Sequence, residues 1–527
     1  MITAEAVPTD QPEPRTDGRS VEELTELTAS GLPWMTMSRI GSEVVLLVST
    51  VVLARMISPA DFGAFAVALI VAGLAISIPT AGVGMSLVQR DVVDREHLEA
   101  GVALALLIAL AVGCVTMAMS YVVVAPLIGS TAAQLIRLCC PMFLLYAVGT
   151  VSAAILQRRL DFRRLAIMEV SGNAARVIVS VGLASAAGLG GTALVYGLLA
   201  GTAVTSAIAI SAARPPRPRL RRRAVRDIAE FGLPAALAAV AWTGFINGDY
   251  AVIAARLGTA AAGQYWRAYT LAVSYQSKVS ILMQSMAFPL LSRSATPEDL
   301  LQLRARIIRI LTVVLFPILG GLAITAPIVV PAAYGHAWTS AVVPTQVLCI
   351  GGAATLVIDA IGSVLMATGR AKGLLGYGLG HFVVYVGSVI VVSQFGLVAV
   401  AIDGAIVHSA FAVVAYAMIA RRTSQSPLGA LWQDICPATV SCLGMGVVAV
   451  PVDLLVSSAH LGSASRFVAI FAACSLGYLV TLRLAFGDAW KDVLLVGRHL
   501  VPGAVQDGAQ SLRRRARALR PITGRSA

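Results

Sequence analysis

The stretch LARMISPADFGAFAVAL (53–69) recurs in altered form as AARLGTAAAGQYWRAYTL (254–271). Gly63 aligns with Gly263 at an offset of 200 residues. Each copy follows one long apolar segment and leads into the next. Repeated halves in a chain of many apolar segments are typical of two helical bundles around a central cavity. The repeat therefore predicts a two-bundle architecture.

The composition places most of the chain in a lipid bilayer. Of its 527 residues, 57% are hydrophobic and only 13% are charged. An average soluble domain is roughly 45–50% apolar and roughly 25% charged. A water-soluble protein of this length could not bury so much apolar surface. The same figures exclude a disordered chain, a coiled coil and a disulfide scaffold.

Fourteen apolar segments are long enough to cross hydrocarbon, which takes about 20 helical residues. They are 34–54, 62–88, 98–127, 133–156, 164–187, 191–213, 227–255, 263–291, 303–330, 339–368, 371–395, 397–420, 430–456 and 464–485. They are continuous rather than alternating, which excludes the strands of a membrane β-barrel. The sequence predicts an all-α polytopic membrane protein with about 14 transmembrane helices in two pseudo-repeat bundles around a central cavity.

Basic residues alternate between the connections, as expected when cytoplasmic loops carry most Lys and Arg. The great majority of the 40 basic residues fall in every second connection and in the C-terminal tail, whereas the opposite loops hold only Arg55, Arg256 and Arg466. Both termini are therefore predicted to be cytoplasmic. The basic stretch 214–226 lies at a membrane exit, so we expect it to contact anionic lipid headgroups rather than nucleic acid.

These features define six predicted regions. They are a cytoplasmic N-terminal tail (1–33), a six-helix bundle (34–213), a basic cytoplasmic linker (214–226), a second six-helix bundle (227–420), two additional transmembrane helices (430–485) and a basic cytoplasmic tail (486–527). Within the last region, 487–500 is predicted to form a short interfacial helix. Ser58, Pro59 and Asp61 predict a capped helix start.

Four segments resemble one family. They are Arg55–Gly63, GVGMSLVQRDVVD (82–94), DYAVIAARLGTAAAGQY (249–265) and Phe288–Arg293. They are similar to elements of the polysaccharide-transport branch of the multidrug/oligosaccharidyl-lipid/polysaccharide flippase superfamily. The likeness covers roughly spans 1 to 12.

The resemblance implies a flippase that moves undecaprenyl-diphosphate-linked oligosaccharides across the bacterial inner membrane, for surface polysaccharides such as exopolysaccharide or lipopolysaccharide. Membrane lipids are expected partners, and the polysaccharide polymerase and chain-length machinery are possible ones. The family supplies no established site residue. The main alternative is a proton- or sodium-coupled exporter of drugs or organic cations from the same superfamily.

Motifs of enzymes are absent from the sequence. It has no Walker loop, no HExxH and no GxSxG. A membrane glycosyltransferase or polymerase would carry a sizeable extramembrane loop, and the internal loops here are short. We therefore expect a non-enzymatic protein with neither cofactor nor metal.

Charged side chains inside spans are the candidate site residues, because a charge in hydrocarbon costs a few kcal/mol unless it is paired or solvated. A guanidinium binds phosphate oxygens in bidentate fashion, which suits a diphosphate headgroup. The predicted substrate-binding cations are Arg39, Arg176, Arg267 and Lys278, and the predicted ion-coupling acids are Glu43, Glu169, Asp249 and Asp359. Spacing places Glu169, Asn173 and Arg176 on one helical face.

Several of these residues have a structural interpretation as well. Arg39–Glu43 and Glu169–Arg176 could be ion pairs that only fix helix packing, and Arg39 and Arg267 lie near span ends, where long side chains snorkel. His381 and His408 are more typical of packed polar residues than of proton relays. Trp34, Trp338 and Trp490 fit an interfacial belt.

Overall fold

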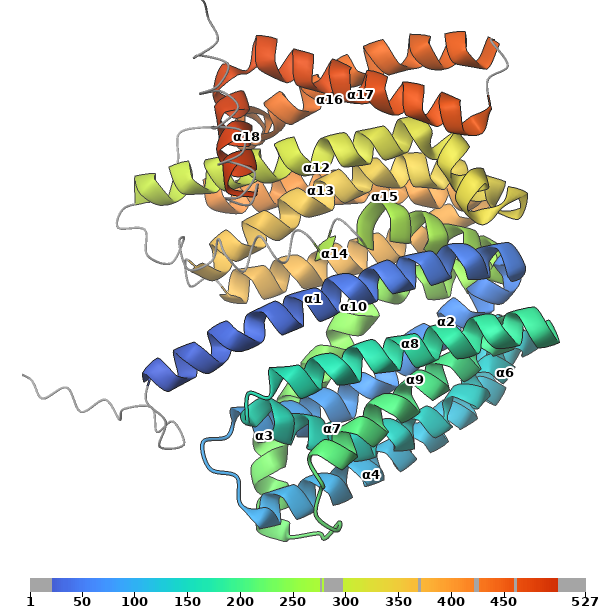
Figure 1. The fold of residues 1–527 in the computed structure, drawn as a ribbon, viewed down its shortest axis with the longest axis vertical. Helices are drawn as coiled ribbons and strands as arrows, with labels where there is room; N and C mark the ends of the chain where they lie inside the picture. Colours follow the sequence, from blue (N-terminus) through green and yellow to red (C-terminus); the bar gives the residue numbers. More distant parts are fainter. Residues whose placement is uncertain are drawn as a thin grey trace, which may run out of the picture. The chain divides into compact units, whose positions relative to one another are not determined.

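The computed structural model describes residues 21–274, 277–278, 297–367, 371–420, 426–458 and 462–500, and every element among them is helical (Figure 1). The α-helices are α1 (Val21–Met56), α2 (Pro59–Pro79), α3 (Met85–Gln89), α4 (Arg95–Met119), α5 (Ala125–Leu127), α6 (Ser130–Cys139), α7 (Pro141–Arg158), α8 (Phe162–Ala187), α9 (Gly191–Ala212), α10 (Arg222–Tyr269), α12 (Pro297–Tyr334), α13 (Val342–Ala367), α14 (Ala371–Val392), α15 (Leu397–Ala420), α16 (Pro427–Ser458), α17 (Ser463–Ala485) and α18 (Gly487–Leu500). Short π-helical turns η1 (Thr80–Gly84), η2 (Ser120–Val124) and η3 (Thr270–Ser274) and 3-10 turns η4 (His336–Ala341) and η5 (Ser393–Phe395) join them.

The membrane-spanning character of the chain is confirmed. The described residues contain fewer candidate spans than the fourteen that the sequence predicts. Eleven helices there are long and apolar enough to cross a bilayer, or twelve with a helix pair bent by 49° (Arg222–Gly244 and Ile246–Ser274). The eleven overlap the predicted spans two to six and nine to fourteen. The predicted spans that have no counterpart among the eleven helices are the first, the seventh and the eighth. Helix α1 covers the first predicted span without being among the eleven, and the bent pair carries the seventh and the start of the eighth.

Helix α2 begins as its sequence predicts. Ser58 caps it from an extended conformation (φ −66°, ψ 153°), and its hydroxyl oxygen accepts from the backbone N–H of Asp61 at 3.1 Å. Pro59 occupies the first turn. The short helix predicted at 487–500 is also present, as α18. The predicted Phe288–Arg293 element lies outside the described residues.

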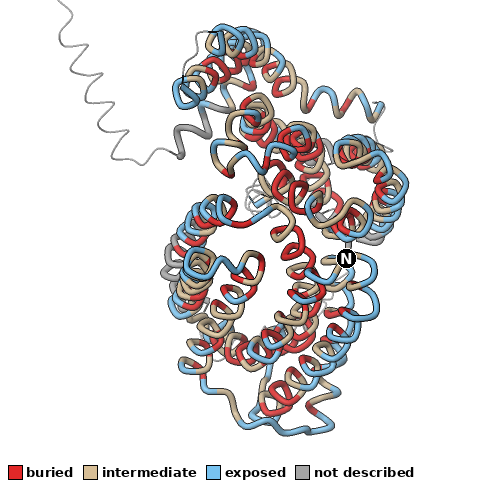
Figure 2. The backbone as a smooth tube through the Cα atoms, turned by 90° about the vertical axis from the view of Figure 1, so that its right-hand side faces the viewer, coloured by how far each residue is buried: buried red, intermediate tan, exposed pale blue. Residues whose placement is uncertain are grey.

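The chain divides into two compact units. The first contains residues up to Arg267 together with Ala333–Ser340 and Val386–Val400, and the predicted linker 214–226 falls inside it. In this unit α8 lies along both α9 and α1 (Figure 1), and α7 contacts α9 and α4. Figure 2 shows buried residues on the helix faces turned toward neighbours in the same unit.

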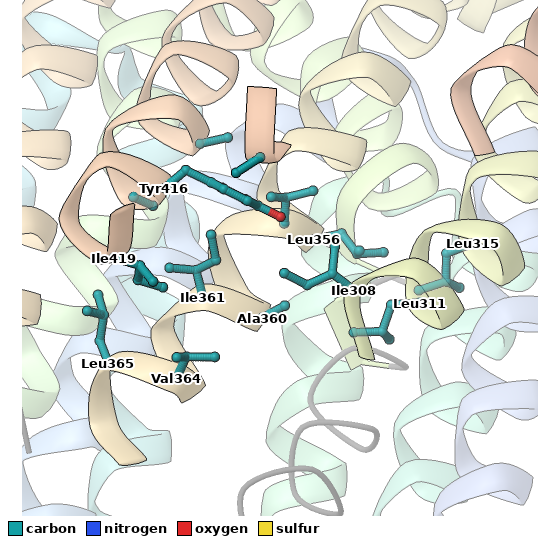
Figure 3. Packing of buried hydrophobic residues seen from close by; sticks show 14 residues of the cluster. Ile308, Leu311, Leu315, Leu356, Ala360, Ile361, Val364, Leu365, Tyr416 and Ile419 are labelled. Carbon is teal, nitrogen blue, oxygen red and sulfur yellow. The ribbon is translucent and has the colours of Figure 1, made fainter. Parts of the chain in front are cut away.

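The second unit contains Ala268–Ala332, Ala341–Tyr385 and the chain from Ala401 onward. Figure 3 shows part of its core, where Ile308 and Leu311 of α12 lie beside Leu356 and Ile361 of α13 and Tyr416 of α15. Helices α16 and α17 pack along each other in this unit.

A reciprocal backbone contact joins the two copies of the sequence repeat. A Cβ added to Gly63 would overlap the carbonyl oxygen of Thr259, and one added to Gly263 would overlap that of Pro59. Pro59 and Thr259 are themselves 200 residues apart, as the two glycines are. The contact is therefore the same from either side, like an isologous two-fold interface. Only glycine permits so close an approach of two helices.

A buried ion pair joins α12 to α16 inside the second unit. Arg304 Nη2 of α12 lies 3.2 Å from Asp434 Oδ2 of α16, and the hydroxyl of Tyr416 on α15 donates to the same oxygen at 2.7 Å. The side chains of Arg304 and Asp434 are 9% and 5% exposed. Attraction to this carboxylate offsets part of the cost of burying the guanidinium.

We expect alanine at Gly63 or Gly263 to destabilise the first unit by about 1–3 kcal/mol, because the added Cβ forces two backbones apart. Thermal unfolding of the purified protein in detergent would show a lower midpoint for either variant. Gly182→Ala is the matched control, since a Cβ there meets nothing within 4 Å. Unfolding midpoints equal to that of the control would contradict the contact.

We expect Asp434→Ala to cost about 3–5 kcal/mol, because it leaves the Arg304 guanidinium buried without its carboxylate. Asp453→Ala, which breaks the half-exposed pair of Arg466 and Asp453, should cost about 1 kcal/mol or less. The apolar double variant Arg304→Met/Asp434→Leu should regain most of the lost stability. The three unfolding midpoints, compared with wild type, test this ranking.

Candidate functional site

A cavity of about 710 Å³ lies inside the first unit, between the α2–η1–α3 segment and helices α7, α8 and α9. Its polar lining residues are Thr80, Tyr146, Thr150, Gln157, Glu169, Asn173, Arg176, Thr202, Thr205 and Ser206. The volume is in the range of small-molecule binding sites. These polar residues share the lining with small and apolar ones, and the volume leaves room for a ligand of small-molecule size.

Small residues set the shape of the cavity. A Cβ on Gly201 of α9 would lie 2.7 Å from the carbonyl oxygen of Gly172 on α8, so these helices touch backbone to backbone. Thr202 and Thr205 donate their hydroxyls to carbonyls one turn earlier on α9, each at 2.9 Å. Because each hydroxyl donates to a carbonyl oxygen of its own helix, these threonines line the cavity without leaving a hydroxyl proton unsatisfied.

Helix α8 brings three predicted residues to the cavity. Glu169, Asn173 and Arg176 all line it, as their spacing predicts. Glu169 is exposed and Arg176 is half-buried. Among the described residues neither side chain forms an ion pair, so a Glu169–Arg176 packing pair is not formed. A guanidinium offers only N–H donors, and that of Arg176 lies at the cavity lining.

The π-helical turn η1 forms part of the cavity wall, which sequence reasoning missed. Thr80 and Gly84, the two ends of the turn, line the cavity, and Pro79 directly precedes it. Single π-helical turns inside α-helices are frequent at functional sites. In the sequence, Pro79 followed by Gly82 and Gly84 was the pattern that could have indicated an irregular helical turn here.

Arg267 lies in an aromatic cage rather than in the cavity. Its Cζ is 4.5 Å from the ring centroid of Phe62, 5.1 Å from that of Tyr334, and 5.3 Å from those of Trp266 and Trp338. The residue is 2% exposed. Cation–π attraction to several rings stabilises a guanidinium away from water.

The sequence predicts that Trp338 belongs to an exposed interfacial belt, and this prediction is wrong. Trp338 is instead buried in the aromatic cage. It is fully buried because its ring packs on Phe62, with centroids 5.4 Å apart. Three hydrogen bonds fasten the same region: Trp338 Nε1 to the Ala54 oxygen at 2.8 Å, Arg55 Nε to the Ala333 oxygen at 2.9 Å, and Gln264 Nε2 to the Ala337 oxygen at 2.7 Å. They link both copies of the repeat to residues 333–340.

The remaining candidates lie apart from the cavity lining. Arg39 on α1 is exposed and Glu43 is half-buried, and the described part of the chain contains no ion pair between them. Lys278 is exposed. Asp249 is buried, with one carboxylate oxygen accepting from the N–H of Tyr250 at 2.9 Å, and Asp359 is half-buried on α13.

The many candidate membrane-spanning helices, with an arginine-containing cavity inside the first unit, are typical of a multi-pass membrane transport protein. The chain belongs to the polysaccharide biosynthesis protein family, whose sequence model matches residues 52–343. The resemblance to the polysaccharide-transport branch of the flippase superfamily is thereby confirmed.

Individual proteins that are similar to this chain are consistent with membership of this family. The chain is 28% identical to the lipopolysaccharide biosynthesis protein WzxC of Escherichia coli K12, over 66% of this chain and 71% of WzxC. It is 25% identical to the succinoglycan biosynthesis transport protein ExoT of Rhizobium meliloti, over 90% of this chain and 97% of ExoT. Its fold is similar to that of the lipid II flippase MurJ in an inward closed conformation, with a TM-score of 0.68 and 14% identity over 86% of this chain and 99% of MurJ.

We expect the cavity to be hydrated. In a cysteine-free background, cysteine placed at Asn173 or Thr202 should react with a small water-soluble thiol reagent in membranes, because only a hydrated thiol ionises readily. Ala193→Cys on α9 is the matched control, since Ala193 is fully buried and does not line the cavity. Labelling of Asn173→Cys and Thr202→Cys no faster than that of the control would mean that water does not fill the cavity.

Proposed function

We propose that this protein is a non-enzymatic flippase that translocates undecaprenyl-diphosphate-linked oligosaccharide repeat units across the bacterial inner membrane by alternating access. The observation that carries the proposal is Arg176 in a polar cavity with no ion pair among the described residues. A diphosphate needs compensating positive charge where hydration is limited, and a guanidinium offers paired N–H donors. Undecaprenyl-linked glycans are substrates that join such a headgroup to polar sugars.

The relatives support the same substrate class. The names of WzxC and ExoT place those proteins in the biosynthesis of lipopolysaccharide and succinoglycan, and ExoT is named a transport protein. Moving a lipid-linked repeat unit breaks no bond, which agrees with the absence of enzyme motifs from the sequence. Membrane lipids would surround the protein, and the polymerase and chain-length machinery would receive its product.

The architecture that we propose for transport has fourteen spans in two pseudo-repeat bundles around a central cavity, with both termini cytoplasmic. Two observations support it. Gly258 (φ 87°) interrupts α10 at the predicted connection between the seventh and eighth spans. The reciprocal contact of Gly63 and Gly263 relates the two halves of the repeat symmetrically.

The cationic path that we propose starts at Arg176. Lys278 and Arg39 are both exposed and would add positive charge along it. Arg267 would reach substrate only after its aromatic cage opened. Ion coupling by acidic side chains is assigned to Glu169 in the cavity and to the predicted acids outside it. Those acids are Glu43, Asp249 and Asp359.

The decisive experiment measures flipping of a fluorescent undecaprenyl-diphosphate oligosaccharide in proteoliposomes. We expect Arg176→Ala to lower the flipping rate about 10- to 100-fold, the loss of one charge-assisted contact of about 1.5–3 kcal/mol. Arg176→Lys should recover part of the rate, since lysine restores charge but not bidentate geometry. The matched control is Arg159→Ala, an exposed arginine that does not line the cavity.

Three outcomes would be informative. Flipping by wild type and its loss in Arg176→Ala alone support the proposal. Equal rates in wild type and Arg176→Ala would remove Arg176 from the substrate path. Transport of organic cations by wild type, with no flipping of any lipid-linked glycan, would replace the flippase with the exporter.

A further inference from the structure

A cluster of aromatic and imidazole rings joins α14 to α15 inside the second unit. Tyr377, His381 and Tyr385 recur every four residues on α14 and so share one face, and His408 and Phe411 lie on α15. The His381 ring stacks on Phe411 with centroids 4.4 Å apart. It also meets the His408 ring edge to face at 4.9 Å. Both helices are long and apolar enough to cross the membrane, so the two imidazoles meet between two candidate membrane-spanning helices.

The backbone fixes which nitrogen of His408 carries a proton. His408 Nδ1 lies 2.6 Å from the carbonyl oxygen of Gly404, one turn earlier on α15. A carbonyl oxygen only accepts hydrogen bonds, so Nδ1 must be the protonated nitrogen of the neutral ring. The lone pair of His408 is therefore on Nε2, which is the nitrogen that takes up a further proton.

The contact between the rings limits the pair to one added proton. Two imidazolium ions at 4.9 Å would repel strongly, because apolar helices screen charge far less than water does. A single imidazolium is different. On His381 it would lie against the face of Phe411, with centroids 4.4 Å apart, and on His408 it would lie 4.9 Å from the Tyr385 ring centroid. Aromatic rings attract a cation in either position.

The other ionisable groups around the pair come from three helices. On α14, the Tyr377 hydroxyl donates to the Phe411 oxygen at 3.0 Å. Tyr377 interacts electrostatically with Asp359 of α13. On α15, Asp403 directly precedes Gly404, and it too takes part in an interaction. The carboxylic acids among these neighbours are therefore Asp359 and Asp403.

We propose that His381 and His408 form a single-proton binding site that couples transport to the transmembrane proton gradient. The coupling rests on the flippase function proposed above, whereas proton binding by the pair does not. One N–H bond forms at His408 Nε2, or on His381, when the proton enters from one side. The same bond breaks when the proton leaves toward the other side, and no other bond changes.

Proton binding is tested directly by solid-state NMR of the full chain, reconstituted in bilayers with ¹⁵N-labelled histidine. The chain has six histidines, so the pair is assigned by comparison with the double variant His381→Phe/His408→Asn. Phenylalanine keeps the stacking on Phe411, and asparagine keeps an N–H in the place of Nδ1. On lowering the pH from about 8 to about 4, the pair should gain one imidazolium per chain. A gain of none or of two overturns the single-proton site.

Coupling is tested by flipping of the fluorescent undecaprenyl-diphosphate oligosaccharide with and without an imposed pH gradient, while an internal pH dye follows proton flux. We expect the gradient to accelerate wild type. His408→Asn and His381→Phe should each keep the gradient-free rate within about twofold and lose the acceleration and the substrate-driven proton flux. His336→Gln, at an exposed histidine of the first unit, should behave as wild type.

The outcomes separate the two proposals. If wild type flips the probe and a pH gradient changes nothing, or if both variants keep the acceleration, coupling by the pair is wrong and the flippase function stands. If wild type flips no lipid-linked glycan, the flippase function fails and coupling fails with it. The NMR titration then still decides whether the pair binds a proton.

Discussion

The cost of placing a charge in hydrocarbon governs how the charged side chains of this protein are arranged. The described helices meet that cost in three ways. Arg267 is surrounded by four aromatic rings. Arg304 shares the carboxylate of Asp434 with a tyrosine hydroxyl. Arg176 borders a polar cavity instead. The first two arrangements surround the guanidinium with protein groups and so suit a fixed structure. The third places the guanidinium at a cavity, which is the arrangement on which the proposed function rests.

The membrane character and most of the spans were predictable, because hydropathy and the distribution of basic loops report directly on the solvent around each segment. The start of α2 at Ser58 followed from local capping chemistry. The π-helical turn at Thr80–Gly84 and the bend in α10 were not predicted. Both interrupt an apolar run without changing its composition, so a count of hydrophobic residues passes over them.

The site was predictable where its residues share one helix. Glu169, Asn173 and Arg176 were found from their spacing, because an α-helix turns a local pattern into a face. The cage around Arg267 was not found, since its rings come from positions 62, 266, 334 and 338, and no local pattern relates them. The Tyr-His-Tyr face of α14 was visible in the sequence. Its contact with His408 depends on how α14 meets α15, which spacing within one helix does not specify.

The reciprocal contact of Gly63 and Gly263 has an evolutionary consequence. When a duplicated segment packs against its own copy, each copy becomes part of the environment that selects mutations in the other. A side chain gained at either glycine meets the backbone of the opposite segment, so neither position can change without a cost to the other. The surrounding residues differ widely between the two copies, as Ser58-Pro59 and Gly258-Thr259 do. The paired glycines are thus the positions at which the two segments constrain each other most directly.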